Sequence, residues 1–220
     1  MDPIFSLPAS TLKKLNAYRD SAYLLQTIPH IKLFRLTYRF LKLWAIRRGI
    51  FSARFGYLGG VHLVLLLSRL LKRISPDKLT NLTAVEAIQL FFDEYSKFEY
   101  EDEIVLDPEI STNVYRRTIS REPLVIGTIY PPIVNVAHTA SRHTLRTFRG
   151  EVLRASQMLR GNCGWNQLAG GEDGEAEREF LDTFGHFIKI DIRYWGKNSA
   201  RGMTLVGGIE SRCVLLLVGK

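Results

Sequence analysis

Residues 41–61 read LKLWAIRRGIFSARFGYLGGV and contain the helix end and the helix start that decide the fold. The first of these residues close a predicted basic helix over residues 31–48, in which apolar side chains recur at helical spacing. Gly49 ends that helix, as a glycine after a helix C-terminus commonly does. Gly59 and Gly60 open a second helix, residues 61–74. Its first two turns are apolar on nearly every side, so we expect it at the centre of a domain.

Other helices are predicted on both sides of this stretch. Two short helices, ending at Leu15 and at Thr27, precede it. Thr83 and Glu86 have the spacing of a capping box, which predicts a helix that begins there and runs to Lys97. Residues 145–159 form a last amphipathic pattern.

After residue 133 the pattern changes. Ile188, Ile190 and Ile192 alternate with polar residues, which predicts a half-buried strand, and the apolar residues 213–218 predict a second one. The fold class expected is therefore α+β. An all-helical domain over residues 1–133 is followed by a small α/β domain over residues 134–220.

The net charge of +8 is distributed unevenly. Residues 1–74 contain 13 Lys and Arg against two Asp and Glu, whereas residues 75–133 contain five against 11. A concentrated positive field suits a polyanion such as RNA or a triphosphate. A basic protein without such a partner fits the charge equally well.

Several classes of protein and site are disfavoured. The longest apolar run, residues 61–67, is too short to cross a bilayer, and the first residues lack the features of a secretory signal. Cys163 and Cys213 have no zinc or disulfide spacing. No P-loop or hydrolase motif occurs, and His138 and His143 are read as ordinary surface or packed histidines.

Six segments, in order along the chain, resemble motifs of eukaryotic nuclear poly(A) polymerases. They are residues 15–19 (LNAYR), 34–52 (FR, then LKLWAIRRGIFS), 55–61 (FGYLGGV), 91–100 (FF, then SKFEY), 123–131 (PLVI, then YP) and 207–212 (GGIESR). Each segment is weak alone, but six in register make the resemblance fairly specific.

The resemblance implies a poly(A) polymerase central-type domain over residues 1–133 and an RRM-like (ferredoxin-like) RNA-binding domain over residues 134–220. It also implies ATP with Mg or Mn as cofactor, the RNA 3′ end as substrate, mRNA 3′-end polyadenylation as the process, and the nucleus as the location. Expected partners are a separate nucleotidyltransferase domain or 3′-processing proteins, and no membrane.

The same resemblance indicates a set of nucleotide contacts, namely Asn16, Lys42, Gly59, Gly60 and Val61. The amide of Asn16 suits a base edge or a ribose hydroxyl, although it equally suits a helix cap or a turn. The two glycines permit close approach of backbone to a ligand, or else they serve a tight turn.

Candidate RNA contacts are basic residues in both parts of the chain: Arg47, Arg48, Lys189, Arg193, Lys197 and Arg201. Those before residue 49 also fit a solvated helix face, and Trp44 between them is expected in the core. Tyr194 and Trp195 suit stacking on bases, with core packing the alternative for at least one.

The chain also departs from the family. It contains no Gly-Ser dipeptide and no Asp-x-Asp, so the metal ligands and catalytic residues are expected outside it. Ala17 replaces a glycine, and His62 and Leu63 replace a small residue and a tryptophan. The first expectation is a part of a polyadenylating enzyme that is inactive alone. The alternative is a non-catalytic RNA-binding or scaffold module derived from one.

Overall fold

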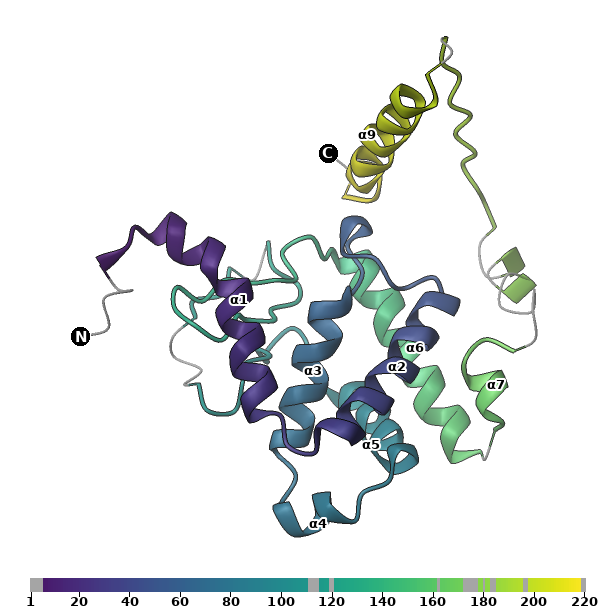
Figure 1. Cartoon of the computed structure of the whole chain (residues 1–220). Coiled ribbons are helices and arrows are strands. Elements are labelled where there is room, and N and C mark those ends of the chain that lie inside the picture. Colours follow the sequence, from purple (N-terminus) through teal and green to yellow (C-terminus); the bar gives the residue numbers. More distant parts are fainter. Residues whose placement is uncertain are drawn as a thin grey trace.

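The computed structural model describes residues 6–110, 115–118, 121–161, 163–171, 178–179, 181–182, 185–195 and 198–218. These residues form a helical body and a separate C-terminal helix (Figure 1). The helices and short turns are α1 (Ala9–Thr27), α2 (Ile31–Arg47), η2 (Ala53–Phe55), α3 (Gly60–Lys72), α4 (Pro76–Thr80), α5 (Ala84–Lys97), α6 (Arg142–Arg160), α7 (Trp165–Leu168) and α9 (Ser199–Val218). Within the described residues, no helix is long and apolar enough to span a membrane.

The predicted helix boundaries are largely confirmed. The Thr83–Glu86 capping box is present, because Thr83 Oγ1 accepts a hydrogen bond from the Glu86 backbone N–H and Glu86 accepts one from the Thr83 N–H. The two short helices before residue 28 are one continuous helix, α1, since no glycine or proline interrupts residues 9–27.

The core lies where α2, α3, α5 and α6 meet. Trp44 of α2 is fully buried, as expected, and its ring contacts Phe92 of α5 edge to face with centroids 4.8 Å apart. Leu63 and Leu66 place the apolar face of α3 in the same cluster. Phe148 of α6 also belongs to it, so this core continues beyond residue 133.

The α+β fold class is wrong for the described part of the chain, which contains isolated bridges but no strand. Residues 186–195 are extended and mostly exposed, and residues 213–218 lie in α9. An alternating pattern makes a strand only where a neighbouring strand takes up its backbone N–H and C=O groups. None does so here, and the described residues therefore contain no RRM-like α/β domain.

The C-terminal helix stands apart from the helical body and approaches it near η2 (Figure 1). An ion pair joins the two, with Arg54 Nη1 3.3 Å from Glu210 Oε2. Both side chains are about half exposed, so this contact adds little stability.

Candidate functional site

A pocket of about 730 Å³ opens between α1, α3 and the loop of residues 128–138. Its volume is in the range of small-ligand sites, roughly 300–1,000 Å³. Its polar lining comes from all three elements: Lys13, Asn16 and Asp20 of α1, the α3 residue His62, and Thr128, Asn135 and His138 of the loop. Gly60 and Val61, at the start of α3, complete one wall.

Asn16 lines the pocket from α1 and is almost fully buried. Its Nδ2 donates hydrogen bonds of 3.1 Å to the backbone oxygens of Tyr130 and Pro132. Since both neighbours can only accept, the amide nitrogen must face them. Its Oδ1 is buried without a hydrogen-bond partner among the described residues. The amide thus fastens α1 to the loop and leaves one buried acceptor without a hydrogen bond among the described residues.

Two further contacts hold the same loop against α1. The Tyr130 backbone N–H donates to Asp20 Oδ1 at 3.1 Å, and the Arg19 guanidinium lies 4.1 Å from the centroid of the Tyr130 ring. Burial raises the pKa of Asp20, although the hydrogen bond from Tyr130 opposes this shift. The pocket therefore has a fixed rim on this side.

The start of α3, from Gly60 onward, forms another wall of the pocket. Gly59 caps α3, and a Cβ on Gly60 would lie 3.0 Å from the Tyr38 hydroxyl, so the helix start is tightly packed. The first N–H groups of a helix lack intrahelical acceptors and favour anions. Val61 is largely exposed and lines the pocket.

Of the predicted nucleotide contacts, the structure brings Asn16, Gly60 and Val61 together, with Gly59 adjoining them. The pocket also contains Lys13, His62 and His138, which sequence reasoning missed. In the sequence His62 stands out only as a departure from the family, and no sequence signal places it near Asn16. Lys13 lies one helical turn before Asn16, a spacing that could have indicated it.

The basic residues of α2 do not line this pocket. Lys42 is exposed and lies 5.6 Å from the centroid of the Phe51 ring, and Arg47 is exposed. Arg48 instead donates to Glu151 at 2.8 Å and 3.0 Å and to Glu179 at 2.6 Å. Burial opposes its charge, but these bonds outweigh burial and raise the pKa of Arg48.

The C-terminal candidates are spread along residues 189–201, away from the pocket lining. Lys189 is exposed and pairs with Asp191 at 3.3 Å, and Arg193 and Arg201 are exposed. Lys197 lies outside the described residues. Tyr194 packs against Gly202, whereas Trp195 is fully exposed.

Metal ligands were expected elsewhere. Among the described residues, no group of three or more His, Cys, Asp or Glu is placed to hold a metal ion.

Comparison with known proteins identifies the family. The model of the poly(A) polymerase central domain matches residues 33–169, more than half of the chain. The poly(A) polymerase of Dictyostelium discoideum is 28% identical over 96% of this chain, and nuclear poly(A) polymerase 1 of Arabidopsis thaliana is 26% identical over 92%. The chain spans only 26% and 28% of the length of these two relatives.

Solved structures share the fold. A cytoplasmic RNA terminal U-transferase superposes with a TM-score of 0.51 at 21% identity, covering 66% of this chain and 59% of that one. Cid1 in complex with its short product ApU gives 0.53 at 21% identity, covering 67% and 58%. Sequence match and fold agree, and the chain belongs to the poly(A) polymerase central domain family.

Proposed function

We propose that this chain supplies ATP- and RNA-binding surfaces to a polynucleotide adenylyltransferase. The observation that carries the proposal is the pocket in which Asn16 of α1 meets Gly60 and Val61 of α3. The sequence relatives are poly(A) polymerases, and one structural relative, the Cid1 poly(U) polymerase, was solved bound to MgATP.

The proposed ligand contacts follow from the chemistry of the walls. The N–H groups that begin α3 and the ammonium of Lys13 attract phosphate, while Asn16 Oδ1 accepts from a ribose hydroxyl or an adenine amino group. Metal ions, when bound, would activate the RNA 3′-hydroxyl and neutralise the departing pyrophosphate. We propose that the carboxylates that hold them belong to a separate nucleotidyltransferase domain.

A substitution of Val61 tests the ATP site. Because Val61 is exposed and lines the pocket, Val61→Trp fills the space without disturbing the core. We expect the affinity for a fluorescent ATP analogue to fall about tenfold or more, since a filled pocket loses direct contacts worth about 1.4 kcal/mol. Val85→Trp, at an exposed position on α5, is the matched control.

If ATP binds in this pocket, Val61→Trp should lower the affinity for the ATP analogue and Val85→Trp should not. Equal affinities in wild type, Val61→Trp and Val85→Trp would place ATP outside this pocket. A wild-type chain that binds no ATP at all would remove the nucleotide part of the proposal. Thermal unfolding of each variant checks that the fold is retained.

One observation favours the alternative, a non-catalytic RNA-binding or scaffold module. Both amide hydrogens of Asn16 are taken by backbone oxygens, which leaves less of this residue for a nucleotide. Binding of RNA without any binding of ATP would support that alternative.

Location, partners and domain division are part of the proposal. Several relatives are named nuclear poly(A) polymerases, so we propose a nuclear location and mRNA 3′-processing proteins as partners. The region after residue 133 is proposed to contribute RNA contacts through Lys189, Arg193, Lys197 and Arg201. Arg47 at the end of α2 and the following residue, Arg48, are proposed as further RNA contacts, and Lys42 of α2 is proposed as a nucleotide contact.

A further inference from the structure

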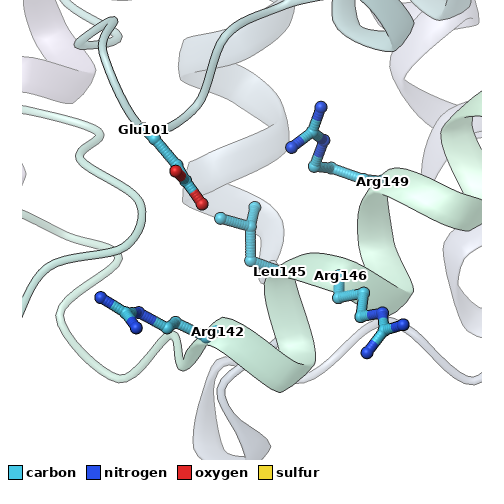
Figure 2. A pocket seen from close by; sticks show the side chains of 5 residues that line it. All are labelled: Glu101, Arg142, Leu145, Arg146 and Arg149. Atoms are coloured by element: carbon cyan, nitrogen blue, oxygen red, sulfur yellow. The ribbon is translucent and has the colours of Figure 1, made fainter.

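Three arginines occupy the first half of α6 around a second hollow. Arg142, Arg146 and Arg149 line a depression of about 410 Å³ together with Leu145 and Glu101. Figure 2 shows the arginines spread around Leu145, with the Glu101 carboxylate pointing toward that side chain. Positions 142, 146 and 149 fall on one helix face, spaced by about one turn each.

These arginines lack the partners that the rest of the helix provides. Further along α6, Arg154 pairs with Glu179 and Arg160 pairs with Asp93. Arg142 and Arg146 are exposed, and neither forms an ion pair with any described residue. Arg149 lies 5.7 Å from the centroid of the Tyr100 ring and is likewise unpaired within the described part of the chain. The arginines in the C-terminal half of α6 are therefore paired with acids, whereas those in its first half are available to a ligand.

Glu101 is fixed at the edge of this depression. Arg117 donates hydrogen bonds to the backbone oxygens of Glu101, Tyr100 and Pro123, which hold the loop in place. No ion pair joins the Glu101 carboxylate to the arginines of the hollow, although all four residues line it. One negative charge therefore faces three positive ones, and the N-terminal end of α6 adds its partial positive charge.

The depression is close to the ATP pocket along the chain. His138 lines the pocket and Arg142 lines the depression, and these two residues are four positions apart in the chain. Their Cα atoms are thus at most about 14 Å apart, even for a fully extended chain. An RNA strand whose 3′ end lies at the pocket can therefore reach α6 within a few nucleotides.

We propose that Arg142, Arg146 and Arg149 bind the phosphate backbone of the RNA just upstream of its 3′ end, and that Glu101 limits the strength of this contact. The inference rests on the proposed function, because it takes the pocket as the position of that end. A row of guanidinium groups one turn apart suits successive phosphates, which they can hold in a bidentate manner. Such contacts position a strand without reading its sequence.

Binding of a short fluorescein-labelled oligo(A) to the full chain, measured by anisotropy over a salt series, tests the proposal. In Arg142→Gln/Arg146→Gln we expect an affinity about tenfold lower and a salt slope smaller by about 1.4, or about 0.7 for each lost phosphate contact. Lys32→Gln/Lys78→Gln removes the same charge from exposed positions on other helices, and we expect a loss of about twofold. Glu101→Gln should strengthen binding several-fold.

Equal losses in the two double variants, or no gain in Glu101→Gln, would overturn the proposal. So would displacement of the RNA by poly-glutamate as readily as by unlabelled oligo(A), which would indicate an acidic protein partner. Binding of the ATP analogue is measured in parallel. If ATP fails to bind while the arginine variants still lose RNA, the α6 site stands and only the nucleotide site fails.

Discussion

His62 connects the start of α3 to the loop of residues 128–138, which lines the pocket beside α1. Its Nδ1 accepts from the Gly59 N–H at 2.8 Å, so the proton of the neutral ring is on Nε2, which donates to the Val136 oxygen at 2.9 Å. Burial lowers the pKa of His62, although the two backbone hydrogen bonds oppose this, and the nearby His138 lowers it further. The folded chain therefore favours the neutral ring.

This protonation preference predicts a pH-dependent stability. The unfolded chain takes up a proton at His62 near the ordinary pKa of 6.5, and the folded chain only at a lower pH. The free energy of unfolding should therefore fall as the pH drops below about 6.5, by about 1.4 kcal/mol for each unit of the shift. Urea unfolding at a series of pH values measures this.

Two variants separate His62 from other acid-sensitive groups. His62→Gln should lose this part of the pH dependence, whereas His143→Gln, at an exposed position on α6, should keep it. Identical pH profiles for wild type and His62→Gln would contradict the assignment of the neutral ring.

Among the elements, α2 and α6 are tied together by Arg48. Its side chain is only 7% exposed, and it bridges Glu151 of α6 and Glu179. Removing one member of a buried ion pair leaves an uncompensated charge. The same arginine was predicted to contact RNA. If its role is structural, its loss should lower stability; if it contacts RNA, its loss should weaken RNA binding.

Arg48→Gln should therefore lower the free energy of unfolding by about 2 kcal/mol, less than for a fully buried pair, because Glu179 is 42% exposed and water can solvate the acids left behind. Arg47→Gln, at the exposed neighbouring position, should change it by less than about 0.5 kcal/mol. Urea unfolding measures both. A stable Arg48→Gln variant that binds RNA more weakly than Arg47→Gln would instead favour the RNA contact.

At the scale of the whole molecule, the pocket and the arginine-lined depression on α6 belong to one helical body whose core runs from α1 to α7. In the proposed enzyme this body binds substrates while the carboxylates lie elsewhere. The purified chain of 220 residues should then leave an RNA primer unextended in the presence of ATP with Mg or Mn, because adenylyl transfer needs metal ions held by carboxylates.

Gel analysis of the primer measures this, with an intact poly(A) polymerase as the positive control. Robust incorporation of AMP from ATP by the chain alone would contradict the proposal that the catalytic carboxylates lie in a separate domain. The RNA-binding measurements on the α6 arginines would remain valid in that case.

The sequence by itself determined the main helices between residues 31 and 160, and the family. The apolar spacing around Trp44, the capping box at Thr83 and the glycines before α3 are local signals, and each acts within a few residues. Family motifs, in turn, predicted Asn16, Gly60 and Val61 as nucleotide contacts, and these three residues line one pocket.

Tertiary structure decided what depends on contacts between distant residues. Residues 188–192 alternate as a strand does but have no partner strand, so they form none. Arg48 is neutralised by residues more than a hundred positions away, while Arg142 and Arg146 form no ion pair with any described residue. Spacing predicts which face of a helix a side chain occupies, but only packing brings the opposite charge or hydrogen-bond partner to it.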